Sequence, residues 1–235
     1  IFDKHRNNIV SVRESHVNEK NEPLNEIVFI DLNHKSNEKV IVTGNDFYSN
    51  PRISPNGKSM VWLSWNHPNM PWDGNELWIA DLDSEGFLFN KRKIISDQES
   101  VFQPEWSPDG ILYFVSDRNG WWNLHKFNNN QVEIVLEDKA EFGSPMWVFG
   151  MSNYVFASSD LIISKYAKNG YWHIGKIDLN TNVLEDIKLE EGYDISRSNI
   201  EIYQGKIYFG GGSVSKVFSI FEFDLNTNVL KTLKK

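Results

Sequence analysis

The sequence predicts an all-β fold, a β-propeller of about five four-stranded blades. Three observations predict it: a repeat along the chain, apolar runs of strand length, and Asn-Gly or Asp-Gly pairs between them. The string Asp-Leu-Asn-Thr-Asn-Val-Leu occurs at 178–184 and again at 224–230. Four short strands in each repeat of about 40–50 residues are typical of a propeller blade, whereas a β-sandwich has no reason to repeat at a fixed period.

A shared template extends the repeat over the whole chain. In five segments an apolar residue stands four positions before an Asp or Asn, and these residues are Ile27, Leu77, Leu124, Ile174 and Ile220. They are spaced by 50, 47, 50 and 46 residues, which chance does not readily supply. The sequence therefore predicts five units, at about 1–47, 48–100, 101–141, 142–194 and 195–235.

The second unit shows the four strands of a blade. Apolar and aromatic residues predict strands at 50–54, 59–65, 76–81 and 93–96, with a tight turn at 54–57. Asn-Gly and Asp-Gly suit tight hairpins because both central residues can take a positive φ. Such pairs stand at 56–57, 109–110, 119–120 and 169–170.

The first unit aligns from its second strand onward. Residues 8–12 match residues 59–63, and the first strand of this unit is missing from the alignment. The chain also begins with Ile1 rather than Met. We expect a fragment of a larger ring, forming an open arc with exposed edge strands that invite pairing.

Composition excludes several classes of function. Lys and Arg number 24 against 32 Asp and Glu, a net charge of −8, which argues against nucleic-acid binding. The absence of cysteine excludes a disulfide scaffold, a thiolate zinc site and a thiol nucleophile. Apolar runs fall far short of the roughly 20 residues that span a bilayer, so no membrane partner is expected. The six histidines lack metal-ligand spacing, so we expect neither a metal nor a cofactor. We expect a cytoplasmic rather than a periplasmic protein. Because the chain starts at Ile1 rather than Met, its N-terminus does not indicate the compartment.

Several strings resemble known propellers. The Ser-Pro-Asn-Gly at 54–57 and the Ser-Pro-Asp-Gly at 107–110 resemble the turn of TolB-type blades, with Asn56 where Asp is usual. Longer strings are similar to the propeller of the prolyl oligopeptidase family, on its acylaminoacyl-peptidase and dipeptidyl-peptidase-like branch. They lie at 13–16, 45–57, 62–78, 103–110, 114–124 and 141–150.

The resemblance implies a two-domain serine peptidase. In that family a propeller caps an α/β-hydrolase domain with a Ser-Asp-His triad and restricts access to short peptides. A nucleophile elbow has the pattern G-x-S-x-G, and the nearest string, at 211–215, lacks the closing glycine. We therefore assign no catalytic residue to this chain, and expect a hydrolase domain and a short peptide as its partners. The alternative is a stand-alone TolB-type propeller that acts as a scaffold for protein–protein contacts.

The loop at 66–72 is the first candidate for a functional surface. It carries His67 and Trp72, and its two prolines make it stiff, which suits a surface that meets a substrate or a partner domain. The alternative is a rigid loop that only packs on its own blade.

In the neighbouring unit, Glu14 and His16 share one face of a strand and Arg13 points to the other. By analogy with the peptidase family, Glu14 is a candidate to hold a free amino terminus; otherwise it is a charge that lines a channel.

The third unit supplies two further candidates. Arg118 could pair with a peptide carboxylate or carbonyl, or it could bridge two blades. Trp121 and Trp122 alternate, so that one can lie in the core while the other is exposed. The Asp178 and Asp224 strings lack the features of a calcium loop and are interpreted as turns, in which Asp and Asn bond to nearby backbone.

Overall fold

A computed structural model describes residues 1–16, 22–33, 38–188, 194–195, 199–213 and 215–234. These residues form strands, turns and loops. In the same ranges, the structure contains no helix with the length and apolar character needed to cross a membrane.

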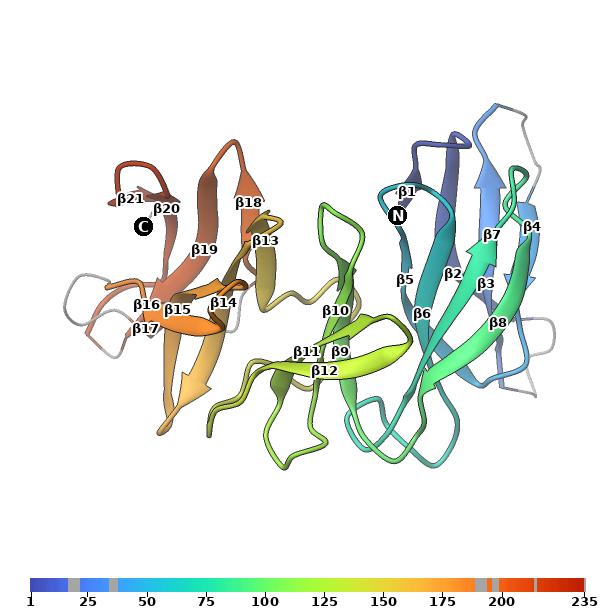
Figure 1. The fold of residues 1–235 in the computed structure, drawn as a ribbon, viewed down its shortest axis with the longest axis horizontal. Helices are drawn as coiled ribbons and strands as arrows, with labels where there is room; N and C mark the ends of the chain where they lie inside the picture. The colour runs from blue at the N-terminus through green and yellow to red at the C-terminus, as the bar shows by residue number, and fades with distance from the viewer. Residues whose placement is uncertain (17–21, 34–37, 189–193, 196–198, 214, 235) are drawn as a thin grey trace. The chain divides into compact units, whose positions relative to one another are not determined.

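The described strands form five sheets, each built from strands that are consecutive in the sequence (Figure 1). The first contains β1 (Phe2–Asp3), β2 (Asn8–Ser15), β3 (Leu24–Asp31) and β4 (Glu38–Val42). The second contains β5 (Phe47–Ile53), β6 (Ser59–Trp65), β7 (Glu76–Leu82) and β8 (Leu88–Ile95). The third contains β9 (Val101–Trp106), β10 (Leu112–Ser116), β11 (Asn123–Asn128) and β12 (Gln131–Leu136).

The last two sheets continue the pattern. The fourth contains β13 (Tyr154–Ser158), β14 (Leu161–Lys168), β15 (Tyr171–Asp178) and β16 (Val183–Asp186). The fifth contains β17 (Asp194–Ile195), β18 (Glu201–Tyr203), β19 (Lys206–Gly212), β20 (Ser219–Asp224) and β21 (Val229–Lys234), with β17 and β18 both paired to β19. The predicted all-β fold of repeated four-stranded sheets is confirmed.

The first strand of the first sheet is minimal. β1 has two residues and pairs through Phe2 with Ile9 and through Asp3 with Asn8. The buried Asp3 carboxylate accepts a hydrogen bond from Arg6 Nη1 at 2.8 Å. Arg6 also donates to the carbonyl oxygens of Gly57 and Asp83. Because a buried charge is costly without a partner, this ion pair is part of what holds the short strand in place.

The strands of the second sheet follow the predicted pattern except at its edge. β6 has the predicted bounds, and β7 begins at the predicted Glu76. The last strand, β8, begins at Leu88 rather than at Lys93. Half of its eight residues are polar or charged, and five of the eight lie exposed. The strand at a sheet edge that faces water commonly carries charged residues. A prediction based on runs of apolar residues therefore misses part of such a strand.

Tight hairpins connect the strands, but only one of the four predicted pairs has both residues at positive φ. At Asn169–Gly170 the angles are 52° and 84°, and these two residues join β14 to β15. At Gly57, Gly110 and Gly120 only the glycine has a positive φ, which corrects the prediction. In these three turns the glycine N–H donates to the carbonyl oxygen of the residue three positions earlier, which is Ser54, Ser107 or Asp117. This is typical of a type I turn that ends on an αL glycine.

The two Ser-Pro turns are built alike despite the Asn56 replacement. Ser54 Oγ donates to Asn56 Oδ1 at 2.8 Å, and Ser107 Oγ donates to Asp109 Oδ1 at 2.6 Å. As expected, Asn in place of Asp keeps the turn, because its side-chain oxygen accepts the same hydrogen bond.

By its contacts the chain divides into two compact units. Unit 1 comprises Ile1–Trp106 and Pro145–Phe149, and unit 2 comprises Ser107–Ser144 and Gly150–Lys235. Each has a core of side chains from neighbouring sheets. In unit 1 the core includes Val10, Ile27, Phe29, Val42, Tyr48, Met60, Trp62, Ala80 and Leu82. In unit 2 it includes Ile163, Ile174, Ile187, Ile200, Ile207, Phe209, Phe221 and Phe223.

The turns at Asp178 and Asp224 are of the predicted kind. Asp178 Oδ1 accepts hydrogen bonds from the backbone N–H groups of Asn180 and Thr181. Asp224 Oδ1 accepts from Asn226 and Thr227 in the same way. These hydrogen bonds lower the pKa of each carboxyl. The backbone N–H of Thr181 has the largest effect on Asp178, and that of Thr227 has the largest effect on Asp224. The string at 211–215 begins in β19, but Val214 lies outside the described residues.

Candidate functional site

Unit 1 carries a hollow of about 510 Å³ that is lined mainly by apolar and aromatic side chains. We call it the aromatic groove. It lies between the end of β6, the loop after it, and the segment Pro145–Phe149. Its lining residues are Phe47, Trp65, His67, Asn69, Met70, Pro71, Trp72, Met146, Trp147, Val148 and Phe149.

Three consecutive large side chains of the groove are unusually exposed. Trp147, Val148 and Phe149 have exposed fractions of 69%, 64% and 65%. The ring centroid of Trp147 lies 4.3 Å from that of Trp72. Contiguous exposed apolar surface of this kind marks a binding surface in soluble proteins, whereas a single exposed apolar residue does not.

Aromatic contacts hold His67 at one end of the groove. The rings of Phe47 and Trp65 stack with their centroids 5.5 Å apart. The His67 imidazole meets the Phe47 ring at 5.0 Å and an interplanar angle of 75°. The edge-to-face arrangement is favourable for aromatic rings, so the imidazole position is supported by its neighbours.

The loop that carries His67 and Trp72 is fixed from beneath by Asn75. This fully buried amide donates to the carbonyl oxygens of Pro71 at 2.9 Å and Val101 at 2.8 Å. It also accepts a hydrogen bond from the Val101 N–H at 2.9 Å, and Ser100 Oγ donates to the same Pro71 carbonyl. The loop is thus fixed to β9 of the next sheet as well as to its own, and its outer side chains form a preorganised surface.

Carboxylates lie beside the groove. A second hollow of about 410 Å³ shares Phe47 and His67 with it and is also lined by Glu14, Glu22 and Asp46. The His67 ring nitrogen Nε2 is 3.1 Å from Glu22 Oε2, and the His67 backbone N–H donates to Asp46 Oδ2 at 2.9 Å. We call these three carboxylates the acidic rim. Among the described residues that line the two hollows, none is Lys or Arg.

Glu14 lies on the predicted face of its strand. Its carboxylate is 2.5 Å from the Nε2 atom of His16, two residues along the chain. Arg13 points to the other face and pairs with Glu26 and Glu38. The structure therefore brings Glu14, His67 and Trp72 into adjoining hollows, while the predicted contact of Glu14 with an amino terminus stays a prediction.

Arg118 and Trp121 lie in unit 2, after β10. The Arg118 side chain is exposed, and its backbone N–H donates to Ser116 Oγ at 3.2 Å. Trp121 has an exposed fraction of 38%, whereas the ring of Trp122 packs over Gly143. Trp121 is thus exposed and Trp122 half-buried rather than part of the core, and the binding roles of Arg118 and Trp121 stay predictions.

Comparison with known proteins identifies the fold. No family model matches the sequence, and no curated protein matches it. Solved structures of puromycin-hydrolysing enzymes, one from Mycobacterium tuberculosis, match 100% of this chain at 25% identity and a TM-score of 0.90. The chain has the propeller fold of prolyl oligopeptidase-family peptidases. It spans about a third of their length, 36% of puromycin hydrolase.

More distant matches support the fold alone. Prolyl oligopeptidase B from Galerina marginata matches at 13% identity and a TM-score of 0.72, covering 100% of this chain and 33% of that one. TolB from Acinetobacter baumannii matches at 17% identity and 0.57, covering 97% and 51%. The predicted TolB-like propeller fold, as found in prolyl oligopeptidase-family peptidases, is therefore confirmed, whereas the acylaminoacyl- and dipeptidyl-peptidase types stay predictions.

Residue-by-residue reasoning missed half of the aromatic groove. The exposed residues Trp147, Val148 and Phe149 were part of a string used only for the resemblance. A signal was present, because four large apolar residues follow Pro145 in a segment that lacks the alternation of a half-buried strand. What the sequence does not show is that these residues lie against Trp72, more than seventy positions earlier.

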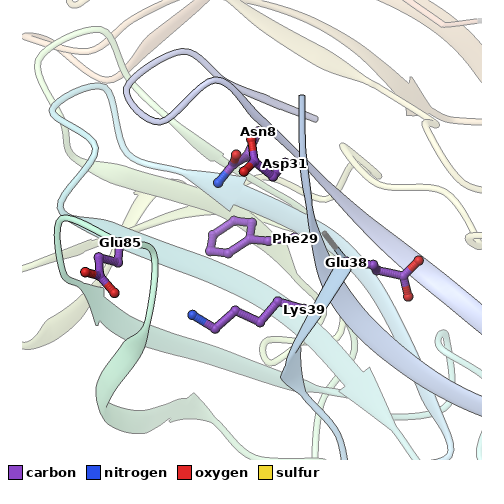
Figure 2. A pocket seen from close by; sticks show the side chains of 6 residues that line it. All are labelled: Asn8, Phe29, Asp31, Glu38, Lys39 and Glu85. Atoms are coloured by element: carbon purple, nitrogen blue, oxygen red, sulfur yellow. The ribbon is translucent and has the colours of Figure 1, made fainter. Parts of the chain in front are cut away.

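Another hollow in this propeller unit, of about 460 Å³, is polar. Figure 2 shows the Phe29 ring at its centre, with Glu38 pointing away from the ring. Its lining residues are Asn8, Phe29, Asp31, Glu38, Lys39 and Glu85. The Lys39 ammonium lies 2.7 Å from the centroid of the Phe87 ring, and Glu38 pairs with Arg13. Charges of both signs line this hollow, and Phe29 is the single apolar residue among the described residues that line it, so it is a weaker candidate than the aromatic groove.

No group of three or more His, Asp or Glu side chains with the geometry of a metal site occurs in the described ranges. Unit 2 instead contains two buried titratable groups with large pKa shifts. Burial lowers the pKa of Lys165 to about 8. Burial, together with the hydrogen bond that Tyr166 donates to Asp186, raises the pKa of Tyr166 far above its usual value. Both groups lie within β14, so they bear on the stability of this sheet.

Proposed function

We propose that this chain is the non-catalytic propeller portion of a serine peptidase that acts on short peptides. The observation that carries the proposal is the match to puromycin-hydrolysing enzymes over the whole chain, at 25% identity and a TM-score of 0.90. The chain has no G-x-S-x-G string, so the nucleophile must be supplied from elsewhere. In this proposal an α/β-hydrolase domain outside these residues performs the chemistry, and the propeller limits access to it.

The same match supports a proposal about the substrate class. Puromycin is an amide of an aromatic amino acid with a free amino group, so a related peptidase would cleave next to a short aminoacyl unit. Dipeptidyl- or acylaminoacyl-peptidase activity fits this substrate size. The propeller would contribute the aromatic groove and the acidic rim as contacts, with no group of its own in the covalent steps.

The test compares this chain with the protein encoded by its complete reading frame. Both are assayed on puromycin, on acyl-peptides and on aminoacyl-anilides. We expect the 235-residue chain to give no turnover above buffer. We expect the complete protein to hydrolyse at least one substrate class and to lose activity with a serine-directed fluorophosphonate. Turnover by the isolated chain would contradict the proposal.

The reading frame also separates this proposal from the scaffold alternative. A frame with a G-x-S-x-G string downstream supports the peptidase, and a frame without a hydrolase domain supports a stand-alone propeller. The TolB match has lower identity and a lower TM-score than the puromycin hydrolase match, so the scaffold is the second candidate.

A further inference from the structure

The aromatic groove and the acidic rim together have a chemistry that neither has alone. The groove offers the faces and edges of Trp72, Trp147 and Phe149, and its volume of about 510 Å³ is within the usual range of small-ligand sites. The rim offers the carboxylates of Glu14, Glu22 and Asp46 at the end where His67 lies. The two hollows share Phe47 and His67 as lining residues, so they adjoin at these two rings.

We propose that this surface binds an amphipathic organic cation. The bulky apolar or aromatic group of the ligand lies in the groove between Trp72 and Trp147. Its positively charged nitrogen lies at the His67 end, beside Glu22 and Asp46. The proposal rests on the proposed peptidase function, in which this surface contacts the substrate, and it names the chemistry of the part of the ligand that the propeller holds. All the residues named for binding belong to this chain.

Burial of the exposed rings is the source of affinity. Trp147 and Phe149 are about two-thirds exposed, at 69% and 65%, so a ligand that covers them removes a large apolar area from water. Little ordering is required, since Asn75 and Ser100 already fix the loop beneath Trp72. A preformed aromatic surface favours flat apolar groups, which stack on it with little loss of conformational entropy.

Charge selects a cation over a neutral or anionic ligand. The described residues lining the two hollows include three carboxylates and neither Lys nor Arg. The Glu22 side chain is 76% exposed, so water and ions can reach its carboxylate as well as His67. The faces of tryptophan rings also attract cations through the ring quadrupole. The carboxylates and the ring faces both attract a cation, and both repel an anion.

The experiment uses three probes with the same ring and different charge. They are 2-naphthylmethylammonium, 2-naphthalenemethanol and 2-naphthoate, titrated into the 235-residue chain and followed by calorimetry. We expect the ammonium to bind about tenfold more tightly than the alcohol, from the sum of a partly exposed ion pair and a cation–π contact. The carboxylate should bind weakest. Methylammonium, which lacks the ring, should show no saturable binding.

Two variants assign the binding to this surface. Trp147→Ala should weaken both the ammonium and the alcohol probe by about tenfold, because it removes part of the apolar platform. Glu22→Gln should weaken the ammonium by a few-fold and leave the alcohol unchanged, because only the charge is lost. Both side chains are largely exposed, so neither substitution opens the core, and circular dichroism and thermal melting check that the fold is kept.

Matched controls lie elsewhere in the chain. Tyr171→Ala removes an aromatic ring that is 64% exposed in unit 2, and Glu85→Gln removes an exposed carboxylate from the polar hollow. Neither should change the affinity for the ammonium probe. The proposal is overturned if the ammonium shows no saturable binding, if all three probes bind equally, or if Trp147→Ala leaves binding unchanged. None of these results depends on whether the complete protein is a peptidase.

Discussion

At the scale of single residues, Lys165 is the clearest conflict between burial and charge. Its side chain has no exposed surface, and desolvation lowers its pKa from 10.5 to about 8. Below pH 8 the lysine is charged in both the folded and the unfolded chain, so the folded state bears the cost of a buried charge. Between pH 8 and 10.5 only the unfolded chain is protonated, and stability therefore rises with pH through this window.

Replacing Lys165 with Met should therefore stabilise the chain at neutral pH. The shift of the pKa from 10.5 to about 8 corresponds to a cost of about 3 kcal/mol at pH 7, and the variant should recover part of it. Denaturant unfolding of both proteins at pH 7, 8, 9 and 10 measures the effect. The gap between them should close as pH rises, and Lys188→Met, at an exposed position, should show no such trend. A gap that stays constant with pH would contradict the assignment.

Gly143 is required for close packing rather than for backbone freedom. A Cβ atom at this position would lie 1.8 Å from Cε3 of Trp122, well inside the van der Waals contact distance. Gly143→Ala should lower the free energy of unfolding by about 1–3 kcal/mol, because the indole must move. In a Trp122→Ala background the same substitution should cost much less. Additive effects of the two substitutions in a double-mutant cycle would show that the clash is not the cause.

At the scale of elements, the loop after β6 depends on the sheet beneath it. Asn75 makes two donated hydrogen bonds and one accepted hydrogen bond to Pro71 and Val101. These contacts tie the base of the loop to β9, and they explain how a loop with exposed aromatic side chains keeps a defined shape. Because the loop already has a defined shape, little conformational entropy of the loop is lost when a ligand binds to Trp72.

Asn75→Ala should both destabilise the protein and impair the groove. The substitution removes the hydrogen-bond partner of both the buried Val101 N–H and the Val101 carbonyl oxygen. It should lower the free energy of unfolding by on the order of 2–4 kcal/mol. Urea unfolding measures the stability, and titration with the naphthyl ammonium probe measures the groove. If stability falls while probe affinity stays unchanged, the loop is held by contacts other than Asn75.

At the scale of the whole molecule, a simple rule builds the first four sheets. Strands that follow one another in the sequence pair with one another, so a repeat in the sequence becomes a repeat of sheets (Figure 1). The fifth sheet departs from the rule only at β17 and β18, which both pair with β19. Short hairpins such as Asn169–Gly170 make this possible because they reverse the chain within two residues. The unusual Asn56 is tolerated for the same local reason, since its turn needs only a side-chain acceptor.

The sequence by itself determined the all-β class, the repeat and the strand bounds near β6, because alternation and turn chemistry are local properties that a short string carries. It also determined that Glu14 and Arg13 lie on opposite faces, which follows from the two-residue period of a strand. It missed the start of β8, because the polar residues 90–93 separate the apolar residues at its two ends. Only the tertiary structure decided that Trp147 packs on Trp72 and that His67 joins the groove to the acidic rim. Those contacts join segments far apart in the chain, and no local pattern records which distant segments will meet.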